Sequence, residues 1–184
     1  MTVSSEMLVL APGVSFDEAN HKYWYRGRKL SGITGLIAKR LGIHMPEEFV
    51  GEYRDEGVHV HKAVQRWVET GDAGSVHPGV QWIIHTLKPQ GVLYSEVLVS
   101  DLKQYASSVD LVSDCGSVVH IADIKTGRFR RDYVTWQLSI YKYFIERYTG
   151  KTVGNCYCIC TKDREMYPIF PVGNDTVEGL LYTF

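Results

Sequence analysis

Hydrophobic and polar positions follow a helical period in five segments of the chain. The longest is residues 45–72, where apolar side chains recur at helical spacing and Pro46 suits the first helical position. Residues 132–150 predict a second long amphipathic helix, with an N-cap at Asp132 and an end at Gly150. Shorter helices are expected at residues 31–40, 77–89 and 174–184.

Between these segments, the pattern changes to short runs of β-branched and aromatic residues that are typical of strands. Residues 16–34 look like a hairpin whose turn is supplied by Gly27. A tight turn at residues 114–117 is expected to join two neighbouring strands. The strands predicted for the core are residues 91–100, 103–113, 117–126, 153–162 and 165–172.

This order of elements predicts one layered domain of the α/β or α+β class over residues 1–184. A chain of 184 residues that is 45% hydrophobic can bury one sizeable core but is short for two. We expect a hairpin and helices over residues 16–88 and the core, which also carries the candidate chemistry, over residues 92–171.

Charge and targeting signals limit the classes of function. The net charge of −1 gives no overall cationic footprint, so nucleic-acid binding would need a local basic patch. The richest such patch contains Lys125, Arg128, Arg130 and Arg131. Residues 1–13 lack the basic region of a signal peptide, and no apolar run reaches the length of a membrane span. We therefore expect a soluble, cytoplasmic protein without a membrane partner.

Three of the four cysteines alternate along one predicted strand, at Cys156, Cys158 and Cys160. Metal clusters usually take cysteines from a turn, where two sulfurs reach one ion. An extended strand instead holds successive sulfurs on the same face about 7 Å apart. The spacing therefore favours small buried residues under a helix over an iron–sulfur cluster.

The candidate chemistry begins with Asp123 and Lys125, which share one face of their strand because strand side chains alternate. Asp110 lies at a corresponding level of the preceding strand, so the two carboxylates would face each other and repel. A divalent cation relieves this cost, and a nearby lysine can orient or deprotonate a water or stabilise charge on a phosphate. Taken alone, however, the Asp123–Lys125 pattern favours an exposed salt bridge.

Four further residues extend this group. Gln137 and Tyr141 are four positions apart and share a helix face, which an ordinary polar helix edge would also explain. His61 lies beside the apolar face of the long helix, where a hydrogen-bonded core histidine is the alternative to a metal ligand. Glu96 lies in an otherwise apolar strand and is either an exposed charge or an acid of the site.

Five motifs occur in order along the chain: "GVHVH", "SEV", "SSVDLV", "DIKTG" and "QLSIY". In this order they resemble the PD-(D/E)XK nuclease superfamily, and specifically the small phage and prokaryotic members of its RecB-like exonuclease branch. The resemblance covers about residues 16–160. It implies a restriction-endonuclease-like core, in which helices flank a mixed central sheet. One departure is "ASSVD", where the family often has glycine before the first acid.

The resemblance also implies a role for each matching residue. Asp110 and Asp123 match the two metal-binding acids, and Lys125 matches the lysine that assists the attacking water. The remaining matches are His61 and Glu96 at the metal, Ile124 through its carbonyl alone, and Gln137 and Tyr141 in positioning the lysine or the substrate. The implied cofactor is one or two Mg²⁺ or Mn²⁺ ions.

The activity implied is metal-dependent hydrolysis of phosphodiester bonds in DNA, by an exonuclease that processes DNA ends in recombination, replication or defence. Arg128, Arg130 and Arg131 would contact phosphates, although a solvated charge run is an equal alternative. The rival functions are a catalytically silent nuclease fold that binds nucleic acid or protein, and a structural partner without nucleic acid. Polarity, strand preference, protein partners and oligomeric state stay open.

Overall fold

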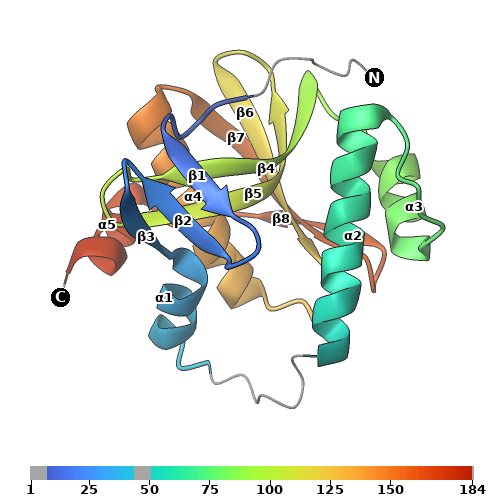
Figure 1. The fold of residues 1–184 in the computed structure, drawn as a ribbon, viewed down its shortest axis with the longest axis horizontal. Coiled ribbons are helices and arrows are strands. Elements are labelled where there is room, and N and C mark those ends of the chain that lie inside the picture. Colours follow the sequence, from blue (N-terminus) through green and yellow to red (C-terminus); the bar gives the residue numbers. More distant parts are fainter. Residues whose placement is uncertain (1–7, 44–50, 184) are drawn as a thin grey trace.

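The computed structural model describes residues 8–43 and 51–183, with the backbone alone for residues 51–54. Across this part of the chain, five helices flank an eight-stranded mixed sheet, which confirms the predicted fold class (Figure 1). The predicted start of the long helix at Pro46 lies outside the described residues. No helix within 8–43 or 51–183 combines the length and apolar character needed to cross a membrane.

The sheet is built from strands that lie in the order β1-β2-β3-β5-β6-β7-β8, with β4 paired to the other edge of β5. The pairs β3–β5 and β6–β7 are parallel and the others are antiparallel. The strands are β1 Val14–Asp17, β2 Lys22–Tyr25, β3 Arg28–Gly32, β4 Val92–Ser100, β5 Tyr105–Asp114, β6 Val118–Lys125, β7 Thr152–Cys160 and β8 Glu165–Ile169. The predicted N-terminal hairpin is thus part of a three-stranded meander, β1 to β3.

The helices occur where the periodicity placed them, with small shifts at their ends. They are α1 Ile33–Arg40, α2 Gly51–Thr70, α3 Pro78–Thr86, α4 Arg131–Thr149 and α5 Asn174–Tyr182. The predicted N-cap of α4 is wrong by two positions, because Arg130 occupies it and Asp132 lies in the first turn. The Asp132 carboxylate instead accepts hydrogen bonds from Arg130 and from the N–H of Tyr133. Gly150 ends α4 in the left-handed conformation, as predicted.

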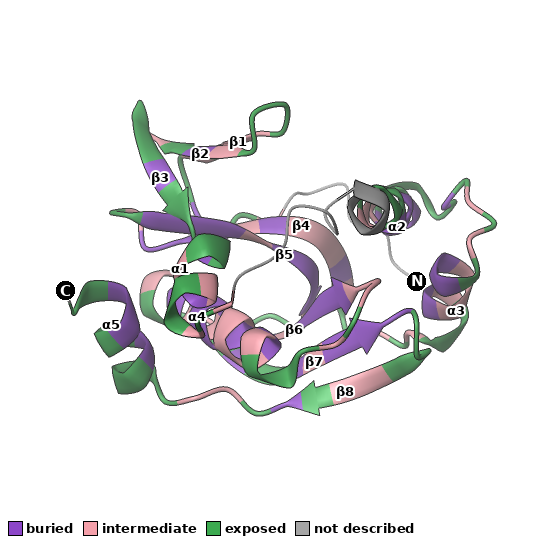
Figure 2. Cartoon of the chain, turned by 90° about the horizontal axis from the view of Figure 1, so that it is seen from below, coloured by how far each residue is buried: buried purple, intermediate pink, exposed green. Residues whose placement is uncertain are grey.

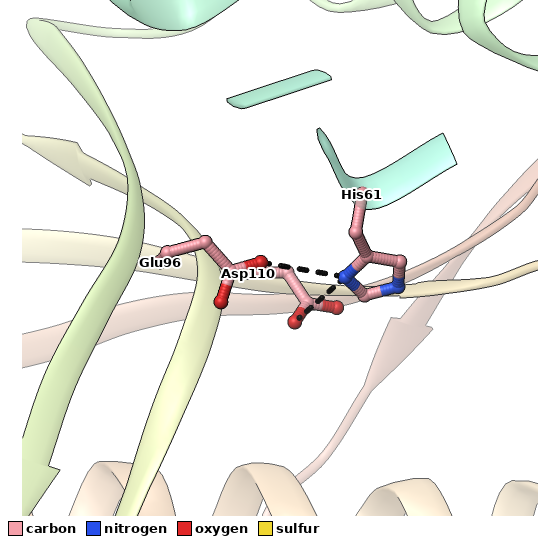
Figure 3. A group of neighbouring side chains, drawn as sticks. All are labelled: His61, Glu96 and Asp110. Atoms are coloured by element: carbon pink, nitrogen blue, oxygen red, sulfur yellow. Dashed lines mark hydrogen bonds and ion pairs between the residues drawn. The ribbon is translucent and has the colours of Figure 1, made fainter. Parts of the chain in front are cut away.

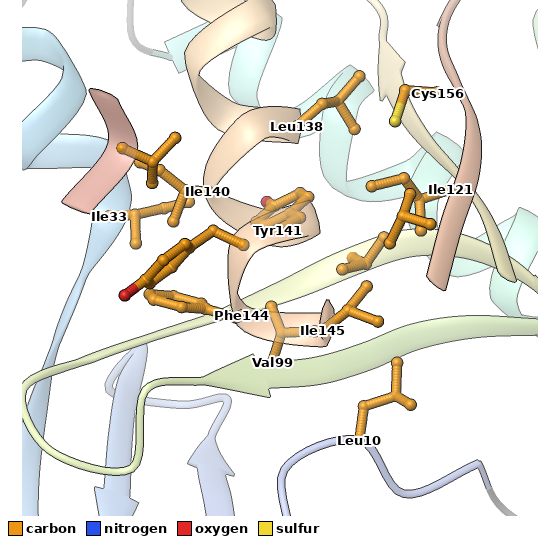
Figure 4. Packing of buried hydrophobic residues seen from close by; sticks show 14 of the residues in the cluster. Leu10, Ile33, Val99, Ile121, Leu138, Ile140, Tyr141, Phe144, Ile145 and Cys156 are labelled. Carbon is orange, nitrogen blue, oxygen red and sulfur yellow. The ribbon is translucent and has the colours of Figure 1, made fainter. Parts of the chain in front are cut away.

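Two hydrophobic clusters hold the helices on opposite faces of the sheet (Figure 2). The larger cluster lies under α4, where Leu138, Tyr141 and Phe144 pack against the sheet (Figure 4). Cys156 and Cys158 belong to this cluster, which confirms the interpretation of the alternating cysteines as buried residues. The second cluster packs α2 and α3 on the other face. Side chains from α2 and α4 can therefore approach the sheet from both sides.

One edge of β5 is divided between two partner strands. Near its start, β5 pairs with β3 at Tyr105 and Ala106. From Leu111 onward it pairs with β6. Residues 107–110 therefore lie between these two ladders, and their backbone on this edge pairs with neither strand. This interval contains Asp110, so the topology creates a gap in the sheet at the predicted site.

The turn from α3 into β4 generates a first prediction, on stability. Gly91 has a φ of +79°, and a Cβ added there would collide with the carbonyl oxygen of Asp114 on the paired strand. Gly91→Ala should lower the free energy of unfolding by roughly 1–3 kcal/mol. Gly35→Ala is the matched control, because Gly35 lies in α1 with open space around it, and alanine there should stabilise by about 1 kcal/mol. Urea denaturation measures both, and equal effects would contradict the assigned collision.

Candidate metal centre and lysine site

Three acidic residues lie at the same level of three adjacent strands. The β4–β5 register continues unchanged on both sides of Glu96, which places this residue opposite Asp110. The last β5–β6 pair is Leu111 with Ala122, so one step further along both strands Asp110 lies opposite Asp123. Like charges in directly opposite positions of a sheet are destabilising. The alignment predicted for Asp110 and Asp123 is therefore present, and Glu96 extends it to a third strand.

His61 brings a nitrogen ligand to two of these acids (Figure 3). Its Nδ1 atom, on α2, lies 3.4 Å from Oε1 of Glu96 and 3.5 Å from Oδ1 of Asp110. One ligand atom from each of the three residues falls within 4.8 Å of the other two, which is close enough to share one metal ion. The negative charge of Asp110 raises the pKa of His61 above its usual value, and burial raises the pKa of Asp110. The cluster is thus a place that favours a cation.

Glu96 adopts a backbone conformation that is rare for its residue type. Its φ is +52° in the middle of β4, although the register on both sides is regular. Such a conformation costs about 1–3 kcal/mol and tends to occur at functional sites. The carboxylate accepts a hydrogen bond of 2.8 Å from the hydroxyl of Ser108 on β5, while its other oxygen faces His61. The strained backbone therefore holds the side chain of Glu96 within reach of the cluster.

Asp123 is 1% exposed and forms an ion pair with Lys125, whose Nζ lies 2.7 Å from Oδ2. The pair has the shared strand face that the sequence predicted, but this face is buried and not the exposed surface of an ordinary salt bridge. Neither oxygen of Asp123 has a hydrogen bond of suitable geometry, and among the described residues these are the only buried side-chain polar atoms in that state. A buried carboxylate without hydrogen bonds is costly, so a second cation beside it would stabilise the site.

The charge state of Lys125 is set by its acidic neighbours. Burial lowers the pKa of its ammonium, but the carboxylates of Asp123 and Asp110 outweigh burial and raise the pKa above its usual value. These acidic neighbours therefore favour the charged ammonium form of Lys125.

Gln137 and Tyr141 share one face of α4, as predicted, and that face is turned toward the lysine. The Lys125 ammonium donates a hydrogen bond of 3.2 Å to Oε1 of Gln137. Nε2 of Gln137 in turn donates to the hydroxyl of Tyr141 at 2.8 Å, and this hydroxyl lies 3.2 Å from Oγ of Ser107. Tyr141 is buried in the larger hydrophobic cluster, so it can position the lysine through Gln137 but lies away from solvent.

Ile124 contributes main-chain atoms, while its side chain is buried in the second cluster. Its N–H donates to Oδ2 of Asp110 at 2.6 Å, across the point where β5 and β6 separate. The carbonyl of the next residue, Lys125, accepts from Thr161 on the opposite side of β6. Because main-chain groups alternate along a strand, the carbonyl of Ile124 faces the same side as its own N–H. It therefore faces the acids, where the sequence analysis expected it.

The three arginines of the basic patch do not share one environment. Arg128 is exposed, in the loop that follows Lys125. Arg130 is also exposed and forms a 3.0 Å ion pair with Asp132 on the first turn of α4. An exposed pair of this kind contributes little to stability and can reopen for a phosphate. Arg128 and Arg130 thus remain candidates for contact with nucleic acid.

Arg131 has a packing role. Its guanidinium lies over the rings of Phe129 and Tyr167, which stack on each other with centroids 4.5 Å apart. The same group donates a hydrogen bond of 3.1 Å to the carbonyl of Pro168 on β8. These contacts fasten the start of α4 to the edge of the sheet. The expectation of a phosphate contact therefore fits Arg131 less well than its two neighbours.

Two residues that the sequence analysis did not assign to the site also lie at the gap in β5. Ser107 contacts Tyr141, and Tyr23 on β2 packs against Ala106, the residue before Ser107. Burial chiefly raises the pKa of Tyr23 to about 12. Strand alternation could have placed Tyr23 on the buried face of the meander. It could not have shown which part of the sheet that face meets.

The residues present suit a divalent cation. The site offers carboxylates and a main-chain carbonyl, which suit hard cations such as Mg²⁺ and Mn²⁺, and one imidazole, which suits transition metals. The Asp123 carboxylate, which has an ion pair but no hydrogen bond, and the opposed acids are the features that such an ion would relieve.

A comparison of the chain with models of known protein families finds no match, and neither does a comparison with curated proteins. The site itself is therefore the basis for inferring a function.

Metal binding generates the second prediction. At a concentration about 100 times its Kd, Mn²⁺ should raise the melting temperature of the protein by roughly 5–10 °C, because it binds only the folded state. Asp110→Asn should abolish this rise, since the amide keeps the hydrogen bond from Ile124 but loses the charge. Glu69→Gln, on the exposed face of α2, is the control and should keep the rise. A rise that persists in Asp110→Asn would place the ion elsewhere.

Proposed function

We propose that the protein is a metal-dependent nuclease that hydrolyses phosphodiester bonds in DNA. The observation that carries the proposal is the buried carboxylate of Asp123, which joins the acidic cluster to a charged lysine and has no hydrogen bond of its own. A purely structural ion pair would not need a third and a fourth acidic or imidazole group at the same level of the sheet.

Each residue of the cluster has a role in this proposal. His61, Glu96, Asp110 and Asp123, with the carbonyl of Ile124, would hold one or two Mg²⁺ or Mn²⁺ ions. Such an ion, when bound, supplies Lewis-acid activation of water and of the phosphate. The carboxylates fix the position of the phosphate by way of the cation, and the strained backbone of Glu96 keeps its ligand atom in place before substrate arrives.

Lys125 supplies the remaining positive charge. Its ammonium is paired with Asp123 and donates to Gln137, and its remaining donor capacity could serve a phosphate oxygen. Negative charge builds up on that oxygen during hydrolysis, so a fixed donor at this point stabilises the transition state more than the substrate. Gln137 and Tyr141 prevent the long lysine side chain from turning away.

DNA is the expected substrate because the ordered motifs resemble a family of DNA nucleases, and exonuclease action is the expected mode for the same reason. A DNA substrate also fits the cytoplasmic location expected from the sequence.

The third prediction tests the proposal. End-labelled linear DNA and covalently closed circular DNA, each single- and double-stranded, are incubated with the protein in Mg²⁺, Mn²⁺ or EDTA. We expect metal-dependent loss of linear DNA, and Lys125→Ala should lower its rate by roughly 100-fold or more because it removes a preorganised charge. Lys103→Ala, at an exposed lysine of the β4–β5 turn, should leave the rate unchanged.

The other outcomes of this assay separate the alternatives. Cleavage of closed circles would identify an endonuclease. A folded protein that shifts DNA on a gel but cleaves none of the substrates would contradict the proposal and favour a silent binding module. A protein that neither cleaves nor binds would favour a structural partner without nucleic acid.

The fourth prediction distinguishes Arg128, which we expect to contact phosphate, from Arg131, which packs against the edge of the sheet. Arg128→Ala should weaken DNA binding and reduce the slope of log Kobs against log[salt] by about 1, because one phosphate contact is lost. Arg131→Ala should mainly lower the melting temperature, since its guanidinium fastens α4 to β8. Arg147→Ala, exposed in the last turn of α4, is the control for both. An unchanged salt slope in Arg128→Ala would show that Arg128 makes no phosphate contact.

A further inference from the structure

The outer face of the N-terminal meander exposes one large aromatic ring. Side chains alternate between the two faces of a strand, so Tyr23 on β2 is buried against β5 while its neighbour Trp24 is 36% exposed on the outer face. Among the described residues, the indole of Trp24 stacks on no other ring and its N–H has no hydrogen-bond partner. None of the helices α1 to α5 lies over this face of the meander (Figure 2). The ring is therefore available to a partner outside the chain.

Positive charges lie beside this ring and at the turn that follows it. Lys29 on β3 is the cross-strand neighbour of Trp24, and the small side chain of Ser15 is its neighbour on β1. The turn between β2 and β3 carries Arg26 and Arg28, which are both exposed. Within the part of the chain that the structure describes, none of these three cations forms an ion pair with an acidic side chain. Their charges are therefore not compensated by the protein.

Both arginines of the turn are held in place by neutral partners. Arg26 and Gly27 have φ values of 50° and 78°, as in the tight two-residue turns that match the twist of a hairpin. The guanidinium of Arg26 lies 5.2 Å from the centroid of the Tyr25 ring. Arg28 donates a hydrogen bond of 3.2 Å to the carbonyl of Leu102. These contacts position the two groups without neutralising them, and a partner that binds such ordered groups loses less entropy.

At the opposite end of the meander, the charges cancel in pairs. Lys22 lies opposite Asp17 in the register of β1 and β2. Glu18, in the turn between these strands, forms an ion pair of 2.8 Å with Lys62 on α2, the residue that follows His61. The meander therefore leads from a positive turn toward the helix that carries the histidine of the acidic cluster.

From this arrangement we infer that the outer face of the meander is a docking surface for single-stranded DNA. The inference rests on the proposed function, from which the choice of DNA is taken. A single strand exposes the faces of its bases, which stack on aromatic side chains, and its phosphates attract nearby cations. Trp24 offers the stacking surface, and the three cations offer the charge. A duplex hides the faces of its bases, so it can use the charges alone. An apolar protein partner is disfavoured, because it would bury these cations without a counter-charge.

The fifth prediction is the effect of Trp24→Ala on the binding of fluorescein-labelled oligothymidylate, a single strand that does not pair with itself. Fluorescence anisotropy is measured in EDTA, which removes the metal and so prevents cleavage. We expect Kd to rise about tenfold, because one stack between a base and an aromatic ring is lost. Trp24→Phe, which keeps a ring, should retain most of the affinity. The Kd for a duplex of the same length should be nearly unchanged in Trp24→Ala.

Phe170→Ala is the matched control for this variant. It removes an aromatic ring that is 81% exposed, just beyond the end of β8 and away from the meander. Its affinity for oligothymidylate should equal that of the unmodified protein, and thermal denaturation checks that each variant folds.

The same assay at several salt concentrations tests the charges. Lys29→Ala should reduce the slope of log Kobs against log[salt] by about 0.7, the value for one phosphate contact of a single strand. Lys29→Arg keeps the charge and should keep the slope. Arg147→Ala, at the far end of α4, should also leave the slope unchanged. A slope that stays the same in Lys29→Ala would show that this face makes no phosphate contact there, contrary to the inference.

Other results would overturn the inference outright. These are an unchanged Kd for oligothymidylate in Trp24→Ala, or an equal loss of affinity for single strand and duplex. Tighter binding of oligouridylate than of oligothymidylate would make RNA the partner in place of DNA. If Trp24→Ala changed the oligomeric state in sedimentation and left Kd unchanged, this face would be an interface between copies of the chain.

Binding in EDTA also separates this inference from the proposed function. A protein that binds oligothymidylate through Trp24 but cleaves no DNA in Mg²⁺ or Mn²⁺ would contradict the nuclease proposal and leave the docking surface in place. A metal-dependent nuclease whose affinity for oligothymidylate does not depend on Trp24 would contradict the docking surface alone.

Discussion

The repulsion between three carboxylates at one level of the sheet is the constraint on which the rest of the site depends. Glu96, Asp110 and Asp123 face one another across adjacent strands, and two of the three lie in a largely buried environment. Such a group is stable only where positive charge or N–H donors compensate it. The structure supplies an imidazole from α2, an ammonium group from β6 and one main-chain N–H. The Asp123 carboxylate has its ion pair with Lys125 but no hydrogen bond, which indicates that this compensation is incomplete.

The backbone pairing of the sheet has a gap where the three acids meet, and this gap lets other groups reach the carboxylates. Because β3 and β6 share one edge of β5, neither covers the interval from 107 to 110, and the carboxylate of Asp110 can reach the N–H of Ile124 across the gap. The helices on the two faces of the sheet place different side chains at this gap. The α2 helix contributes His61 beside the acids, and α4 contributes the amide that holds Lys125. The imidazole of His61 and the amide that supports Lys125 thus come from opposite sides of one sheet.

The sequence predicts those parts of the site that follow from local periodicity. The turn at 114–117 sets the level of Asp110 against Asp123, and the helical spacing of Gln137 and Tyr141 sets their common face. The packing of Arg131 and the position of Tyr23 could not be predicted in this way. Arg131 packs on Tyr167, which is remote in sequence, and Tyr23 meets the site only because β3 joins β5 beside the gap. The positive φ of Glu96 has no signal in the sequence, since nothing there marks a glutamate as strained.

The N-terminal meander packs against β5 directly beside the gap that holds Asp110. Its inner face buries Tyr23 and Leu30 against β5, and its β1–β2 turn forms an ion pair of 2.8 Å between Glu18 and Lys62, the neighbour of His61 on α2. Both side chains of that pair are mostly exposed, so the contact is weak and readily reversible. The buried contact fixes the meander against β5, while the exposed one can open. The meander thus combines a rigid attachment beside the gap in β5 with a more adaptable contact to α2.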